Sequence, residues 1–464
     1  MKSKAICLIV SLVALGSLIA QDVIIEIFGK GGKGSMAVPD FRGAADAQRF
    51  MPVFNQTLWD ELDGSGLFRM IPKTSYPLNS PQRPEDWLTE ESRAAAPRPG
   101  SRSVDSGQAA RELGHRLRDW SGPPVSATYM PIGYAAVQGG RFVLYGWFYN
   151  VAQADVANAQ AFAKTYNGSF DEIGARQVAR EFAADILQRF GATSLVGSKI
   201  IFVSSRAGTK EIWAMDYDGS NQRAITSYRS ISTTPSVSPD GTKVAFTSFV
   251  RNRPEILIHS LLTGRRLPFY NQDASMNATP YFTPDGNNIL FSSTAGGGFA
   301  QIYMSAADGR NLRRVTNVRA VEVEPKVNPK NPSEVVFVSG RSGPQQIYKM
   351  NVEGTDIVRL TTGEGEASNP AWHPEGQHLA FAWTRGFEPG NFNIFVMDVA
   401  SRRLDQLTHG AGRNENPTWA PDGKHLVFAS KRAGRTQIWS MLADGTQMKQ
   451  LTTQGENTMP VWSK

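Results

Sequence analysis

The sequence predicts two domains: a small N-terminal α/β domain, and a six-bladed β-propeller whose ring is closed by the C-terminal strand. Three observations lead to this fold class. A proline-containing turn returns at a nearly constant spacing, a second short motif ends each repeat, and the first 195 residues show neither feature. The 43 glycines and 27 prolines suit a chain of tight turns and short strands.

The repeated turn is clearest in SVSPDGTKVAF, residues 236–246, where two alternating strands flank Pro-Asp-Gly. Gly241 can take the positive φ that this turn requires at its exit. The motif returns after 45, 45, 45 and 47 residues, with its prolines at Pro239, Pro284, Pro329, Pro374 and Pro421. A period in the forties with four short strands in each unit is typical of a propeller blade.

A second motif, usually ending in threonine, closes each repeat. It occurs as AIT at 224–226, RVT at 314–316, RLT at 359–361, and QLT at 406–408 and 450–452, with PFY at 268–270 as the divergent copy. Six copies predict six blades. The first unit lacks an innermost strand, and NTMPVWSK at the end of the chain has the pattern of that strand. We therefore expect 457–463 to complete the blade formed by 198–226, which removes an open sheet edge.

Residues 21–195 show the mixed helix and strand patterns of an α/β domain, and 196–464 form the predicted propeller. The stretch DVIIEIFGKGGK, 22–33, predicts a mobile strand segment, and the Pro-, Arg- and Ser-rich stretch 80–107 predicts a loop insertion. The last helix of the domain lies in DEIGARQVAREFAADILQRF. Its apolar spacing predicts five inward side chains: Ile173, Val178, Phe182, Ile186 and Phe190.

The first 20 residues have the pattern of a secretory signal peptide, with two lysines, an apolar run and a small residue at Ala20. The single cysteine, Cys7, lies inside this segment, so the mature chain is expected to contain no cysteine. No later stretch approaches the ~20 apolar residues of a membrane span. The net charge of +7 is spread along the chain, which favours a solvated surface over nucleic-acid binding.

The motifs of common enzymes on this fold are absent from the sequence, which contains no G-x-S-x-G pentapeptide. His373, His378 and His425 follow repeat positions, and the six histidines show neither H-E-x-x-H nor another zinc spacing. The recurring aspartates Asp240, Asp285 and Asp422 occupy turns. We therefore expect no catalytic residues, cofactor or metal. An exported propeller that binds or cleaves a carbohydrate or peptide in its central channel remains the alternative.

An α/β domain ahead of six SPDG-type blades resembles the TolB family, the periplasmic propeller proteins of the Tol-Pal system. The most specific piece is IIFVSSRAGTKEIW followed by MDYDGSNQRAIT, at the first blade. The resemblance covers essentially the whole mature chain, although 80–107 departs from the family pattern. It implies a periplasmic, monomeric, non-enzymatic adaptor that supports outer-membrane integrity and envelope constriction at cell division.

The resemblance also implies partners and binding residues. A Pal-like lipoprotein docks at the mouth of the propeller channel, a TolA-like protein reads the N-terminal strand, and other outer-membrane proteins are further partners. The N-terminal strand residues are Asp22, Val23, Ile24, Ile25, Glu26 and Ile27. At the channel, the family surface matches Met276, Thr279 and Val323.

The repeats give their own prediction of the channel mouth. The residue before each inner-strand proline is expected where the innermost strand begins. These residues are Thr234, Thr279, Glu324, Asn369, Asn416 and Met459, with Glu322, Glu366 and Glu415 nearby.

Overall fold

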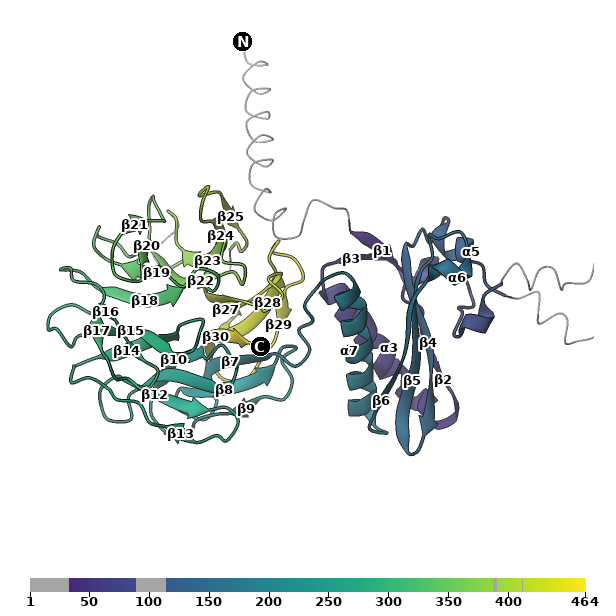
Figure 1. Ribbon diagram of the computed structural model, residues 1–464, viewed down its shortest axis with the longest axis horizontal. Coiled ribbons are helices and arrows are strands. Elements are labelled where there is room, and N and C mark those ends of the chain that lie inside the picture. Colours follow the sequence, from purple (N-terminus) through teal and green to yellow (C-terminus); the bar gives the residue numbers. More distant parts are fainter. Residues whose placement is uncertain (1–32, 89–113, 387–389, 411) are drawn as a thin grey trace, which may run out of the picture. The chain divides into compact units, whose positions relative to one another are not determined.

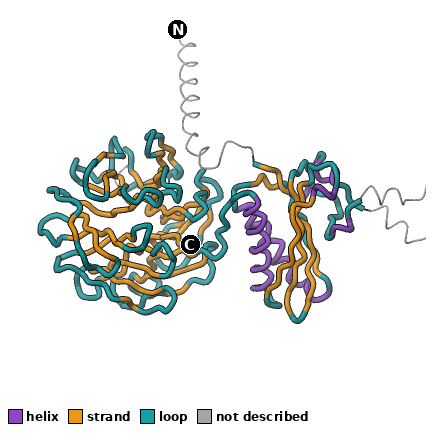
Figure 2. The backbone as a smooth tube through the Cα atoms, viewed as in Figure 1, coloured by secondary structure: helices purple, strands orange, loops and turns teal. Residues whose placement is uncertain are grey.

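The computed structural model describes residues 33–88, 114–386, 390–410 and 412–464. Its contacts separate an N-terminal unit that ends at Val196 from a second unit, Gly197–Lys464. Every helix of the described chain lies in the N-terminal unit, and the second unit consists of strands and loops (Figure 2). The predicted signal peptide and residues 22–32 of the predicted N-terminal segment lie outside the described residues.

The N-terminal unit is built on one sheet with the order β3-β1-β4-β5-β6, and β2 pairs with β4. Its strands are β1 (Gly34–Met36), β2 (Arg42–Gly43), β3 (Phe68–Met70), β4 (Tyr129–Gln138), β5 (Arg141–Asn150) and β6 (Gln160–Gly168). The helices α3 (Met51–Gly64) and α7 (Glu172–Arg189) pack against it (Figure 1). The short helices are η1 (Ala45–Phe50), η2 (Lys73–Ser75), η3 (Pro84–Asp86), α5 (Leu117–Ser121) and α6 (Val156–Ala159). None of the helices in the described ranges is long and apolar enough to cross a membrane.

Helix α7 begins where the Asp171 carboxylate accepts a hydrogen bond from the Gly174 N–H at 2.7 Å. Val178, Phe182 and Ile186 are fully buried, as predicted. The prediction for Ile173 is wrong, because this side chain is 73% exposed. At about 100° per residue, Ile173 lies on the face opposite the middle of the buried stripe.

A second core lies on the sheet face that α3 and α7 leave uncovered. Trp87 and Trp120 are buried there, and Trp87 contacts the ring of Tyr149 at 5.4 Å between centroids. Trp87 belongs to the stretch predicted as a loop insertion at 80–107. The described part of that stretch therefore contributes a core side chain, and residues 89–107 lie outside the described residues.

The propeller consists of six four-stranded sheets, which confirms the predicted fold class (Figure 1). From the innermost strand outward, the first three are β30 (Asn457–Ser463), β7 (Lys199–Ser204), β8 (Glu211–Asp216), β9 (Arg223–Ala224); β10 (Ser232–Val237), β11 (Lys243–Ser248), β12 (Glu255–Ser260), β13 (Arg266–Leu267); and β14 (Asn277–Phe282), β15 (Asn288–Ser293), β16 (Gln301–Ala306), β17 (Arg313–Arg314). The other three are β18 (Glu322–Val327), β19 (Glu334–Ser339), β20 (Gln346–Asn351), β21 (Val358–Arg359); β22 (Ala367–Trp372), β23 (His378–Trp383), β24 (Asn393–Asp398), β25 (Leu404–Gln406); and β26 (Asn414–Trp419), β27 (His425–Ala433), β28 (Arg435–Leu442), β29 (Lys449–Gln450).

The ring closes as predicted, because β30 pairs antiparallel with β7 and places Trp462 opposite Ile200. Each blade also contributes one phenylalanine from its second strand to the packing between sheets. These six side chains are at most 1% exposed: Phe202, Phe246, Phe291, Phe337, Phe381 and Phe428.

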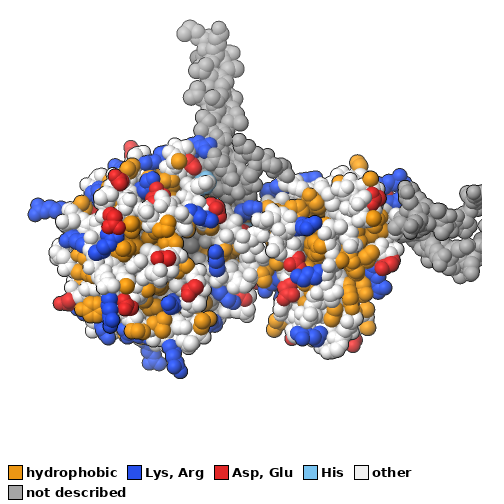
Figure 3. All heavy atoms as spheres, viewed as in Figure 1, with side chains coloured by type: hydrophobic (Ala, Val, Ile, Leu, Met, Phe, Trp, Pro, Cys, Tyr) orange, Lys and Arg blue, Asp and Glu red, His pale blue; other side chains and the backbone are white. Residues whose placement is uncertain are grey.

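On the face drawn in Figure 3, acidic and basic side chains are interspersed.

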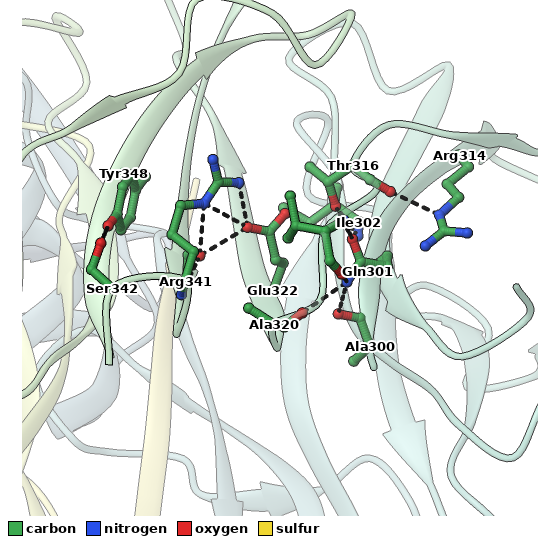
Figure 4. Close-up of polar contacts among 12 residues, drawn as sticks. Ala300, Gln301, Ile302, Arg314, Thr316, Ala320, Glu322, Arg341, Ser342 and Tyr348 are labelled. Carbon is green, nitrogen blue, oxygen red and sulfur yellow. Dashed lines mark hydrogen bonds and ion pairs between the residues drawn. The ribbon is translucent and has the colours of Figure 1, made fainter. Parts of the chain in front are cut away.

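The threonine that ends five of the repeats has a structural role. Its hydroxyl accepts a hydrogen bond from a backbone N–H of the third strand, as in Ile302 N to Thr316 Oγ1 at 3.0 Å. The same hydroxyl donates to Gln301 Oε1, which precedes Ile302 (Figure 4). In the divergent PFY repeat, Asn271 takes over, accepting from Ile256 N and donating to Ile256 O, both at 2.8 Å. Each blade thus has one polar clasp between its two outer strands, and in the five blades with threonine this clasp is buried.

Candidate functional site

The six residues predicted at the channel mouth share one unusual backbone conformation. Each precedes a proline, and each has a positive φ between 49° and 55° although none is glycine. These residues, called the mouth residues below, are Thr234, Thr279, Glu324, Asn369, Asn416 and Met459. Such a conformation costs on the order of 1–3 kcal/mol at each non-glycine position and tends to occur at functional sites.

A β-bulge explains the position of the mouth residues. They lie at the third residue of each innermost strand rather than at its first, and the pairing register shifts there in all six sheets. The following proline has no N–H to donate to the ladder, so it fits a bulge. The prediction that these residues stand where the strands begin is therefore off by two positions.

Hydrogen bonds between neighbouring blades hold the mouth residues. The Glu324 carboxylate accepts from the Asn369 N–H at 2.8 Å and from the Asn369 side-chain amide at 3.0 Å. Asn369 Oδ1 then accepts from the Asn416 N–H at 3.2 Å. Elsewhere on the ring, the Thr279 N–H donates to Thr247 Oγ1 at 3.0 Å. These contacts compensate for the strained backbone and fix the shape of the mouth.

All six mouth residues line one cavity of about 300 Å³, and all are half-buried. The cavity continues along the innermost strands to Trp372, Trp419 and Trp462. Burial raises the pKa of Glu324, an effect that Lys326 and the hydrogen bonds from Asn369 oppose. The channel is thus a concave, partly polar site assembled from six separate blades.

The remaining sequence-predicted residues fall in different places. Met276 directly precedes β14, and its N–H donates to Thr294 Oγ1 at 3.0 Å. Val323 is half-buried beside Glu324 in β18 and does not line the cavity. Glu322, expected near the mouth, is fully buried and ion-paired with Arg341 (Figure 4). Asp22–Ile27 lie outside the described residues.

A polarity difference around the mouth escaped the sequence prediction. The residue directly before each innermost strand is apolar in three neighbouring blades and charged in the other three. The apolar residues are Ile231, Met276 and Val321, and the charged ones are Glu366, Arg413 and Glu456. Ile231 is 46% exposed and Val321 is 38% exposed. Each of these six residues stands four positions before the proline of its innermost strand, so the repeat alignment could have revealed the difference.

His373 and His425 contact residues of blade turns. The ring of His373 is hydrogen-bonded to the Gly423 carbonyl at 2.9 Å, and His425 Nδ1 lies 2.6 Å from Asp422 Oδ2. The His425 contact lowers the pKa of Asp422, against the opposing effect of burial. Over the described ranges, no three His, Cys, Asp or Glu side chains form a group that could hold a metal ion.

Comparison with known proteins adds to this geometry. The model of the TolB β-propeller domain family matches residues 190–381 and 362–464, which is more than half of the chain. The chain belongs to this family. Its similarity to the crystal structure of TolB from Acinetobacter baumannii, with a TM-score of 0.72, covers 93% of this chain and 97% of that one. At 20% identity, this likeness shows the shared fold.

Curated members of the TolB family match shorter stretches. The chain is 34% identical over 142 residues to the protein TolB homolog of Chlorobium chlorochromatii, covering 30% of this chain and 31% of the relative. It is 32% identical over 146 residues to the Tol-Pal system protein TolB of Desulfosudis oleivorans, covering 31% and 32%. The matched stretches span about a third of the length of these relatives.

Proposed function

We propose that this protein is a non-enzymatic adaptor of the Tol-Pal envelope system, exported to the periplasm. Its propeller docks a Pal-like lipoprotein at the channel mouth and thereby supports outer-membrane integrity and envelope constriction at cell division. The supporting observation is the ring of mouth residues, in which six blades hold strained positions around one concavity. Relatives named Tol-Pal system protein TolB support a role in the same system.

The chemistry of the mouth suits a protein partner. Ile231, Met276 and Val321 supply an apolar arc, and charged residues complete the circle. Protein interfaces combine an apolar centre with polar groups that fix orientation. Because hydrogen bonds already hold the mouth residues, the surface needs little ordering when a partner docks.

A binding measurement tests this proposal. The exported protein and the soluble domain of the Pal-like lipoprotein from the same host are titrated by calorimetry. Thr279→Trp places an indole in the mouth and should weaken binding at least tenfold. Thr263→Trp introduces the same side chain at an exposed turn between β12 and β13, and should bind like the wild type. Equal affinities for the wild type and Thr279→Trp would contradict the proposal.

The N-terminal segment forms the second proposed contact. Asp22–Ile27 alternate as a strand beside a glycine-rich stretch, so they can pair with the edge of a TolA-like domain. Deletion of residues 22–33 should abolish capture of that domain while leaving the affinity for the Pal-like domain at the mouth measurable. Retained capture by the deletion variant would reject this contact.

A further inference from the structure

A second ring of side chains lies deeper in the channel, two positions after the mouth residues. Its members all line the cavity: Ser236, Tyr281, Lys326, Ala371, Thr418 and Val461. Of these six, Lys326 alone carries a positive charge. The ring is unequal around the channel, because Ala371 and Val461 have no polar side-chain atom. The polar chemistry of the second ring is therefore concentrated at Tyr281 and Lys326, with the hydroxyls of Ser236 and Thr418 as its other polar groups.

The Lys326 ammonium contacts an aromatic ring of the neighbouring blade. Its Nζ lies 4.6 Å from the ring centroid of Tyr281, a cation–π contact. Within the described part of the chain, no carboxylate or carbonyl accepts a hydrogen bond from this nitrogen. By contrast, Lys349 in the same blade pairs with Glu334 at 2.6 Å. The three N–H donors of this half-buried ammonium are therefore available to an acceptor that enters the channel.

Glu324 is the opposite charge nearest in sequence to Lys326, but its two oxygens accept hydrogen bonds from Asn369 and none from Lys326 in the described structure. Asn369 donates to them from both its backbone N–H and its side chain. Burial lowers the pKa of Lys326, and the charge of Glu324 opposes that effect. Glu324 therefore helps to keep the lysine charged without satisfying its donors.

Two further donors line the same cavity. The Tyr281 hydroxyl and the Asn416 side-chain amide have no hydrogen-bond partner among the residues that the structure describes. Burial raises the pKa of Tyr281 to about 12, so its hydroxyl stays protonated near neutral pH. An acceptor that reaches the second ring therefore meets an ammonium and a phenol on neighbouring blades.

We propose that Lys326 and Tyr281 form an anion site inside the channel that binds a carboxylate group. A single ammonium beside the carboxylate of Glu324 suits a monoanion better than a doubly charged phosphate. The cavity of about 300 Å³ limits the occupant to a small acid or to one inserted side chain. The site goes beyond the proposed docking function, since a free acid needs no partner protein.

Titration with N-acetylglycine, a small monocarboxylate, tests the site on the exported protein. Trp372, Trp419 and Trp462 line the cavity, so tryptophan fluorescence reports occupancy, and melting temperature gives a second readout. Saturable binding is expected with N-acetylglycine but not with its neutral amide at equal ionic strength. Lys326→Met should lose at least tenfold in affinity, and Tyr281→Phe about threefold.

Lys449→Met is the matched control, because Lys449 is exposed on the outermost strand of another blade. It should bind the acid like the wild type. Lys326→Met should melt at or above the wild-type temperature, since it removes an ammonium without an acceptor. A lower melting temperature with unchanged ligand affinity would overturn the proposal, because the lysine would then serve only to support Glu324.

A second experiment distinguishes the two possible sources of the carboxylate, a free acid and a side chain of the partner protein. If the free acid does not bind, Lys326→Met should still weaken capture of the Pal-like domain at least tenfold, while Lys449→Met leaves it unchanged. That result would assign the carboxylate to a side chain of the partner. If neither the free acid nor the partner responds to Lys326→Met, the site is refuted. Failure of the Pal-like domain to bind at all, with saturable binding of the acid, would reject only the docking function.

Discussion

The two units of the molecule bury their aromatic side chains in different ways. In the N-terminal unit, rings from the helices and the sheet form one cluster, in which Phe182 contacts Phe41, Phe162 and Tyr166 at 5.4–6.1 Å between centroids. In the propeller, each blade contributes one phenylalanine at the same position, and the packing is divided among smaller clusters. The first unit depends on two cores, one on each face of its sheet, whereas the second depends on a closed series of similar interfaces.

This difference bears on function. The cores of the N-terminal unit do not enclose a shared central surface, but a ring of interfaces keeps its central surface only while every interface holds. The mouth residues depend on such neighbours, because Asn369 is held by Glu324 and in turn holds Asn416. Damage at one seam is therefore expected to reach the channel mouth.

The closing seam offers the largest test of the comparison. Trp462→Ala should destabilise the propeller by about 3–5 kcal/mol, because it leaves a cavity and removes the hydrogen bond from the indole N–H to Ser198 Oγ at 3.0 Å. Calorimetry should show the propeller transition moving down while the N-terminal transition stays. Trp462→Phe should cost less than half as much. An unchanged melting temperature for the alanine variant would break the closed-ring account.

The corresponding test of the N-terminal unit is Phe182→Ala. Loss of this fully buried ring should cost about 3–4 kcal/mol and move only the N-terminal transition. Ile173→Ala on the same helix is the control, since that side chain is 73% exposed and its loss should stay within about 0.5 kcal/mol. If both transitions move together, the two units do not unfold independently.

A smaller effect tests the polar clasp inside one blade. Thr361→Val keeps the side-chain shape but leaves the buried N–H of Ile347 and the Gln346 carboxamide oxygen without their hydroxyl partner. The expected cost is about 1–3 kcal/mol in urea unfolding of the propeller. Thr263→Val, at an exposed turn, should change stability little. Equal stability of the two variants would show that the clasp contributes nothing.

The smallest expected effect concerns the turn carboxylate Asp240. Hydrogen bonds from Ser238 and Thr242 lower its pKa to about 2, so its stabilising contribution is complete above the ordinary carboxyl pKa near 4. That contribution is lost as the pH falls through about 2. Asp240→Asn should therefore melt slightly below the wild type at pH 7, and the difference should shrink between pH 4 and pH 2. A constant difference over this range would exclude ionisation as its cause.

Much of the propeller could be predicted because its information is repeated. Four blades carry a Pro-x-Gly turn and five end in threonine, so a divergent copy such as PFY can be recognised from the other five. The identity of the mouth residues followed from their position before a proline. Their positive φ could not be predicted, because Thr234, Glu324 and Met459 have no local preference for it and only the bulged ring imposes it.

The N-terminal unit was harder to predict, because each of its elements occurs once and no repeated copy can correct a wrong assignment. Ile173 matched an apolar spacing but lies on the far side of the buried stripe. Trp87 stands in a polar, proline-rich stretch without apolar periodicity. Its burial against Tyr149 depends on tertiary contacts that the local sequence does not indicate. The unpaired donors of Lys326 were equally invisible, since they follow from which acceptors the neighbouring blades use up.

The pairing of β30 with β7 also determines the order in which the propeller folds during synthesis. Chains are synthesised from the N-terminus, so β7 exists while Asn457, where its partner begins, is still more than 250 residues away. Throughout that interval one edge of the earliest blade presents free N–H and C=O groups that could pair with another chain. The ring is therefore completed by one late event, and loss of the last few residues would open the oldest blade rather than delete the youngest.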